Sequence, residues 1–190
     1  MGRHSSDMRE QLVAAAATRF HHRGVASSSL ADIARDAGVA PGDVFSRFAT
    51  MDALAGAVVE RWCYWLDSYF AQLDSIADSR RRLRTYIERA DTEREAYTSF
   101  GCPLAALGRD LRGGALANEA ARPLATQQRW LAEQFSLAGF DPATADSHAH
   151  FLQATLQGSY AMAHARRDSS VITASVAHLL AWLADVQAVR

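Results

Sequence analysis

Apolar residues recur at intervals of three and four along almost the whole of this 190-residue chain, and no other feature limits the fold as narrowly. This spacing lines one face of a helix, whereas a half-buried strand needs strict alternation of apolar and polar residues. Glycine and proline stand at a few isolated points, where one periodic segment ends and the next begins. Alanine, the strongest helix former, supplies 38 residues. The sequence therefore predicts an all-α protein of about nine helices without a sheet.

The ends of these helices are expected at capping and stop signals. Ser29 and Asp32 have the spacing of a capping box, and Gly24 and Gly38 are typical helix stops. Pro41 suits the first position of a helix, because the N–H that proline lacks has no partner there. The expected helices span residues 8–23, 29–37, 41–48, 52–76, 80–98, 104–111, 115–137, 141–166 and 170–189.

Composition and short motifs exclude several classes of protein. No secretory signal precedes the first helix and no run of about 18 apolar residues is present, so we expect a cytoplasmic protein without a membrane span. Cys63 and Cys102 form no CxxC pair and the seven histidines lack ligand spacing, so neither a metal site nor a cofactor is expected. Nucleophile elbows, phosphate-binding loops and paired carboxylates are also missing. The sequence therefore does not predict an enzyme.

The two short segments 29–37 and 41–48 carry the functional signal. They have the proportions of a helix-turn-helix, in which a capped first helix crosses the DNA backbone and the second enters the major groove. Gly38 allows the chain to turn sharply between them. The alternative is a short helical pair with a purely structural role, as many helical bundles contain.

A gapless series of residues around these segments forms a more specific pattern. It comprises Ala14-Ala15-Ala16, Phe20, Gly24, Ser28-Ser29-Leu30, Asp32-Ile33-Ala34, Ala37-Gly38-Val39, Gly42, Phe45, Arg47-Phe48 and Leu54. This series resembles the N-terminal domain of TetR-family transcriptional regulators over about the first 55 residues. Gly101-Cys102-Pro103-Leu104 is similar to a segment of a multidrug-responsive subset of that family. The resemblance implies a DNA-binding domain at residues 1–50 and a helical ligand-binding and dimerisation domain at residues 51–190.

The resemblance also implies a role for eight residues of the helix-turn-helix. Two serines would meet DNA phosphate, four residues would face base edges, and two would lie beside the DNA backbone. In that order they are Ser28 and Ser29; Ala40, Pro41, Gly42 and Asp43; and Phe45 and Arg47. The family usually has tyrosine at position 45, histidine or tyrosine at 47, and lysine where this chain has Met51. Two phosphate contacts are thereby lost, and Arg47 restores one.

The charge balance supports only modest binding to DNA. All 20 basic residues are arginine and oppose 21 acidic ones, which gives a net charge of −1. Residues 1–50 carry +1 and the remaining residues −2. Because phosphate neutralisation supplies much of protein–DNA affinity, we expect a shallow salt dependence that relies on Arg47, Arg9 or Arg3.

Aromatic side chains are dense between residues 62 and 160. In a helical bundle such residues usually form the core, which remains the alternative for each of them. The family resemblance instead implies a central cavity for a small apolar or aromatic ligand. Cys102, which is also expected in the lining, either fills space there or senses oxidants through its thiol. The expected lining is Trp65, Tyr69, Tyr97, Phe100, Cys102, Trp130, Phe151 and Gln157.

The last two expected helices have long apolar faces that include small residues, which permit close helix approach. These residues are Ala154, Gly158, Ala161, Ala165, Ala174, Ala177 and Ala181. The resemblance implies a four-helix bundle with a second copy of the chain, whereas the alternative is packing within one chain.

Together these features favour a homodimeric repressor that binds a palindromic double-stranded operator and leaves it when a small-molecule effector binds. The repressor role comes from the family resemblance alone. Two other classes stay open: a helical adaptor or ligand-binding protein with weakened DNA binding, and a helical enzyme.

Overall fold

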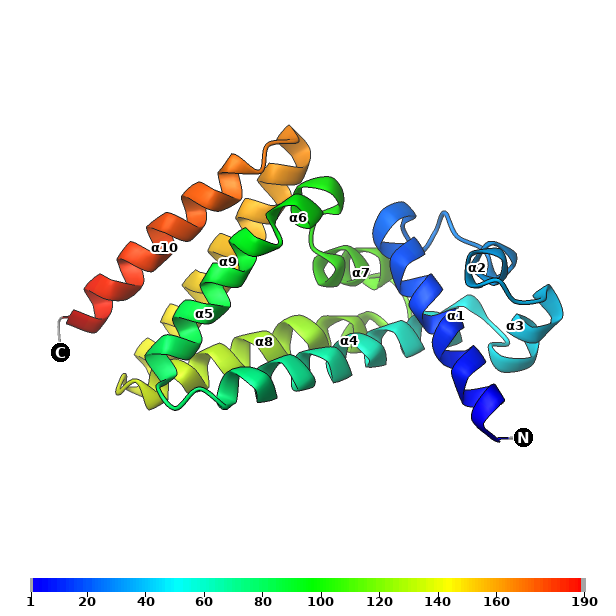
Figure 1. The fold of residues 1–190 in the computed structure, drawn as a ribbon, viewed down its shortest axis with the longest axis horizontal. Helices are drawn as coiled ribbons and strands as arrows, with labels where there is room; N and C mark the ends of the chain where they lie inside the picture. The colour runs from blue at the N-terminus through cyan, green and yellow to red at the C-terminus, as the bar shows by residue number, and fades with distance from the viewer. Residues whose placement is uncertain (1, 189–190) are drawn as a thin grey trace. The chain divides into compact units, whose positions relative to one another are not determined.

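The computed structural model describes residues 2–188, with side chains described for residues 7–186. This part of the chain is helical and contains no strand (Figure 1). It forms two compact units, each built from two stretches of sequence. Unit 1 comprises Met1–Trp65 and Pro103–Pro123, and unit 2 comprises Leu66–Cys102 and Leu124–Arg190. Among the described helices, none is both long and apolar enough for a membrane crossing.

Unit 1 is built around three N-terminal helices, α1 (Gly2–Arg23), α2 (Leu30–Ala37) and α3 (Pro41–Arg47). The first part of α4 (Met51–Asp74), helix α7 (Pro103–Leu111) and the start of α8 (Ala117–Leu137) complete it. Their apolar faces share one core, because side chains from every one of these helices are buried in it. The core includes Leu12, Phe20, Ile33, Val44, Leu54, Leu107 and Ala120.

Unit 2 contains α5 (Ser79–Thr92), α6 (Arg94–Phe100), α9 (Pro142–Arg166) and α10 (Ser170–Ala188), with the remainders of α4 and α8. Helix α10 packs along both α9 and α5, and α6 packs on α9 (Figure 1). The fully buried side chains of unit 2 include Leu83, Leu131, Phe135, Leu152 and Ile172.

The all-helical prediction is confirmed, with one difference in the division of the chain. The segment expected as one helix from residue 80 to residue 98 is split at Glu93 into α5 and α6. Counted as one bent helix, the pair gives nine helices among residues 2–188, and counted separately it gives ten. Glutamate is a good helix former, so the break has no local cause in its helix propensity.

The long C-terminal helices begin at carboxylate caps. Asp141 accepts hydrogen bonds from the backbone N–H groups of Ala143 (3.2 Å) and Thr144 (3.1 Å) at the start of α9. At α10 the carboxylate of Asp168 accepts the N–H of Ser170 at 3.0 Å. Val189, the expected end of this helix, lies outside the described residues.

Candidate nucleic-acid interface

Helix α2 begins at Ser29, the N-cap serine expected from the sequence. Ser29 Oγ accepts the N–H of Asp32 at 3.1 Å and donates to the Asp32 carboxylate at 2.8 Å. The Asp32 carboxylate also pairs with Arg35 one turn later. The hydrogen bonds from Ser29 and Arg35 hold the pKa of Asp32 below its usual value. The start of α2 is therefore fixed by a charged carboxylate at neutral pH.

A left-handed glycine makes the turn between α2 and α3. Gly38 has φ 69° and ψ 28°, a conformation that costs little for glycine and much more for residues with a Cβ. Its N–H donates to the carbonyl of Arg35 at 3.1 Å, and the N–H of Val39 donates to that of Ala34 at 3.0 Å. These two bonds are those of a Schellman motif, which ends one helix and directs the chain into the next.

Arg19 joins α1 to α2 through two ion pairs. Its guanidinium lies 3.1 Å from the Asp32 carboxylate and 2.7 Å from that of Asp36, and its side chain is largely buried. Because this arginine satisfies two carboxylates of α2, its charge is not available for DNA phosphate. Arg35 pairs with Asp32 and Arg61 with Glu10, so the charges of these two exposed arginines are partly offset within unit 1.

Helix α3 starts at Pro41 and turns its first residues outward. Ala40, Pro41 and Gly42 are exposed, while Val44 and Phe48 are buried against the unit 1 core. The Phe45 ring is 59% exposed. Of the residues expected to face base edges, the structure therefore leaves Ala40, Pro41 and Gly42 exposed at the start of α3, with Asp43 half-buried beside them.

Arg47 is turned back onto its own helix. Its Nη1 donates to the carbonyl of Asp43 and to Ser46 Oγ, both at 3.1 Å, and lies 3.8 Å from the Asp43 carboxylate. Its Nε is buried without a hydrogen-bond partner among the described residues. In this position Arg47 stabilises α3, and reaching a DNA phosphate requires a change of side-chain rotamer.

The two serines expected at phosphate differ in their surroundings. Ser28 Oγ donates to the carbonyl of Gly24 at 2.8 Å and is half-buried, whereas Ser29 is the exposed cap of α2. A third hydroxyl, that of Thr50, caps the start of α4 by accepting the N–H of Ala53 at 3.1 Å. The position of Thr50 just before a long helix is the sequence signal for such a cap.

One further arginine near α3 remains exposed. Arg9 on α1 places its guanidinium carbon 5.3 Å from the centre of the Phe48 ring. This cation–π contact fixes the residue beside the C-terminal end of α3 while leaving its charge towards solvent. Arg3, the other arginine expected to support DNA binding, lies outside the described side chains.

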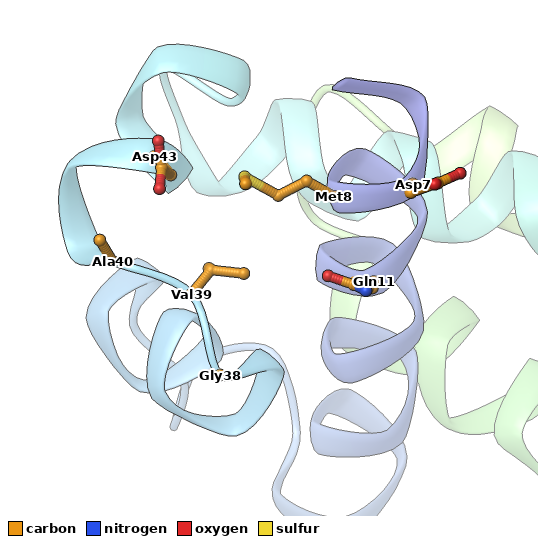
Figure 2. Close-up of a pocket in the computed structure, with 7 residues that line it drawn as sticks. All are labelled: Asp7, Met8, Gln11, Gly38, Val39, Ala40 and Asp43. Carbon is orange, nitrogen blue, oxygen red and sulfur yellow. The ribbon is translucent and has the colours of Figure 1, made fainter. Parts of the chain in front are cut away.

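A hollow of about 400 Å³ separates the start of α3 from α1. Figure 2 shows Ala40 and Asp43 on one side of it, Met8, Asp7 and Gln11 on the other, and Gly38 and Val39 at the turn. The hollow lies on the side of unit 1 where the first turn of α3 is exposed.

Helix α7 anchors the loop that leads into α2. The Asp110 carboxylate accepts the N–H of Val25 at 2.9 Å, directly after Gly24, whose φ is 83°. A Cβ at position 24 would lie 3.0 Å from the same carboxylate oxygen. The separation of 85 positions between these partners explains why no local sequence signal indicated the contact.

The expected ligand-lining residues fall into separate places. Trp65 belongs to unit 1, where its ring meets that of Trp62 edge-on at 5.7 Å. In unit 2, Tyr69 and Trp130 share a buried cluster in which Trp130 stacks on Phe70 at 4.6 Å. Phe100 is exposed, whereas Cys102 and Gln157 are half-buried. The Cys102 thiol lies close enough to Tyr86, Tyr97 and Tyr160 to contribute to the raised pKa of each of these hydroxyls.

A polar network adjoins the aromatic cluster of unit 2. Arg89 lies over the Tyr69 ring at 4.3 Å and pairs with Glu93, which also accepts the Tyr97 hydroxyl at 3.1 Å. The Tyr97 ring stacks on Tyr160 of α9 at 3.9 Å. Burial raises the pKa of Tyr69 to about 12, and it also raises that of Tyr97. These hydroxyls therefore act as neutral hydrogen-bonding groups at physiological pH.

Phe151 is placed apart from these groups. Its ring packs against Trp182 of α10 at 4.8 Å and is 48% exposed. Among the described residues, no group of three histidine, cysteine or acidic side chains has the arrangement of a metal site.

Two family models match the chain. Residues 12–58 match the model for bacterial regulatory proteins of the tetR family. Residues 79–178 match the model described as the C-terminal domain of LmrA/YxaF-like transcriptional regulators. The second match alone spans more than half of the chain, and the first contains the helix-turn-helix. No curated protein gives a significant match.

Solved structures share the fold at low sequence identity. A TetR regulator from Chloroflexus aurantiacus is 19% identical, with a TM-score of 0.81 over 96% of each chain. A TetR-family regulator from Agrobacterium tumefaciens is 20% identical, with a TM-score of 0.79 over 93% of this chain and 97% of its own. A regulator from Legionella pneumophila is 16% identical, with a TM-score of 0.80 over 90% of this chain and 94% of its own.

Proposed function

Since the chain belongs to the TetR family of DNA-binding transcriptional regulators, we propose that it is a repressor released from its operator by a small molecule. In this proposal the protein is cytoplasmic, and two copies bind one palindromic operator. Each copy places its α3 in the major groove. The observation that carries the proposal is the capped α2, the left-handed turn at Gly38 and the exposed first turn of α3, which together form a complete helix-turn-helix.

We assign DNA binding to residues 1–50 and ligand binding and dimerisation to residues 51–190. Exposed Ser29, Ala40, Pro41 and Gly42, together with Asp43, would contact DNA directly. Ser28 would act through the loop that it stabilises, and Phe45 and Arg47 would lie along the backbone. With Arg19, Arg35 and Arg61 paired to acids, few cations remain for phosphate, which supports modest affinity and a shallow salt dependence.

The exposed faces of α9 and α10 support a homodimer. All seven small residues expected at the interface are exposed in the single chain, as is Met162 at 53%. On α9 the small residues repeat at intervals of four and three, which places them in one stripe: Ala154, Gly158, Ala161 and Ala165. Phe151 lies one turn before this stripe and is exposed, so we assign it to the dimer contact in preference to the ligand site.

The aromatic and polar cluster of unit 2 supports the effector site. Tyr69, Tyr97 and Trp130 supply rings, and Arg89 and Glu93 supply hydrogen-bonding groups with no net charge between them. Such a combination recognises a small aromatic molecule, with the rings covering its faces and the polar groups fixing its orientation. Trp65, Phe100, Cys102 and Gln157 remain candidates for the lining.

Effector binding changes DNA binding only if it favours one arrangement of the two helix-turn-helix domains over another. Helix α4 runs without interruption from unit 1 into unit 2, and we propose it as the lever that connects effector and operator. A dimer must reach two half-sites about 34–36 Å apart, so a small rotation of the domains prevents simultaneous binding.

A gel-shift titration on the DNA upstream of the protein's own gene tests the proposal. We expect a discrete complex that random DNA of equal length does not compete away, and loss of the complex on addition of an aromatic compound that binds the protein. Absence of any specific complex at low salt would favour the helical adaptor, for which the missing phenol at Phe45 and the missing ammonium at Met51 argue. A bound compound that leaves the complex intact would exclude that compound as the effector.

A further inference from the structure

The first turn of α3 offers few hydrogen-bonding side chains to a base edge. Ala40, Pro41, Gly42 and Phe45 have none. Ser46 Oγ donates to the carbonyl of Asp43 at 2.8 Å, and Arg47 is bound to the same carbonyl. Within residues 40–47, Asp43 is therefore the residue whose side-chain polar atoms are left over for DNA.

The Asp43 carboxylate is positioned for such a contact. Its side chain is 44% exposed, and no hydrogen bond to its oxygens occurs among the described residues. Figure 2 shows it on the first turn of α3, at the edge of the hollow that Asp7 of α1 also lines. Two carboxylates on one hollow make a phosphate an unfavourable neighbour, whereas a base amino group is a favourable one. Arg47, 3.8 Å away, offsets part of the charge of Asp43 without occupying its oxygens.

The donor and acceptor groups that each nucleobase presents in the major groove determine which base a carboxylate can recognise. In the major groove, guanine presents two acceptors and thymine presents one, so a carboxylate is repelled by both. Adenine presents a donor beside an acceptor, which suits an amide better than a carboxylate. Cytosine presents its N4 amino group as a donor with no acceptor of its own in the groove.

We propose that Asp43 is a specificity-determining residue that reads a cytosine in each half-site by accepting a hydrogen bond from its N4 amino group. This inference rests on the proposed function, because it requires α3 to enter the major groove. It departs from recognition by arginine and guanine, the commonest specific contact, because no arginine of α3 is directed outward.

Selection of binding sites from a random duplex library tests the inference with the full-length chain. The wild type should select a cytosine at one position of each half-site. Asp43→Asn should shift that position to adenine, because an amide pairs with both N6 and N7 of adenine, and Asp43→Ala should lose the preference. Each change should alter discrimination at this position by about tenfold or more and leave the other positions unchanged. Ser46→Ala is the matched control, because the Ser46 hydroxyl is bonded within α3, and its selected site should equal that of the wild type.

The outcomes separate this inference from the proposed function. A selected site that Asp43→Asn and Asp43→Ala leave unaltered would overturn the role of Asp43 while DNA binding stands. Failure of the wild type to select any sequence at low salt would overturn both. Circular dichroism of each variant checks that the chain keeps its helical fold. Asp43→Glu, which keeps the acceptor, should retain a cytosine preference.

Discussion

The turn at Gly38 allows a stability prediction of defined sign and size. Gly38 has φ 69°, and a Cβ built there would have no atom within 4 Å. Gly38→Ala therefore introduces the left-handed backbone strain of an L-residue without a steric clash. We expect it to lower the free energy of unfolding by about 1–2 kcal/mol. For a chain of this length, that corresponds to a fall in melting temperature of about 2–8 °C.

Gly42, four residues later, provides a matched control with the opposite sign. It lies in the first turn of α3 with helical backbone, and a Cβ there would also have no atom within 4 Å. Gly42→Ala should therefore raise stability by up to about 1 kcal/mol, because alanine loses less backbone entropy in a helix. The same chemical change is predicted to act in opposite directions at two neighbouring positions.

Urea unfolding of the two variants, followed by circular dichroism, measures both effects. Asn tolerates the left-handed region better than alanine, so Gly38→Asn should cost less than Gly38→Ala. If Gly38→Ala left the urea midpoint unchanged, or if both alanine variants shifted it in the same direction, the left-handed turn between α2 and α3 would be refuted.

Gly24→Ala combines the same backbone strain with a Cβ 3.0 Å from the Asp110 carboxylate, so it should lower the urea midpoint more than Gly38→Ala does. Equal midpoints would show that the Asp110 side chain moves aside without cost. Arg47→Ala should weaken operator and random DNA alike and reduce the salt slope by about one ion per subunit in anisotropy titrations, and a loss confined to the operator would contradict its backbone role. Asp32 has a lowered pKa, so its stabilising contribution is present above an unfolded pKa of about 3.9 and is lost as pH falls through the folded value. Asp32→Asn should therefore lower the free energy of unfolding at pH 7 and make that free energy less dependent on pH in acid. Urea midpoints of the variant that fall in parallel with those of the wild type below pH 5 would contradict this prediction.

Local signals were sufficient for most of the helix-turn-helix. The N-cap at Ser29, the stop at Gly38 and the start at Pro41 each follow from the conformational preference of one or two residues, and the structure has all three. The inward return of Arg47 also had a local signal, because Asp43 stands four residues before it on the same helix face. From the sequence, Arg47 was interpreted only as a cation for phosphate.

Features that depend on distant contacts were beyond sequence reasoning. The break at Glu93 coincides with a carboxylate that binds both Arg89 and Tyr97, and Tyr97 in turn stacks on α9. Asp110 reaches the loop after α1 from a helix far along the chain. The aromatic residues were recognised as a group, but their division between clusters depends on helix rotation, which an aromatic count does not specify.

The spacing of the half-sites tests most directly whether two copies of this chain read DNA through α3. Once the operator has been selected, anisotropy titrations compare it with a version that carries five extra base pairs between the half-sites. About half a turn of DNA then separates the two recognition surfaces, so the account predicts that affinity falls to the level of random DNA. Undiminished affinity for the lengthened operator would contradict the account.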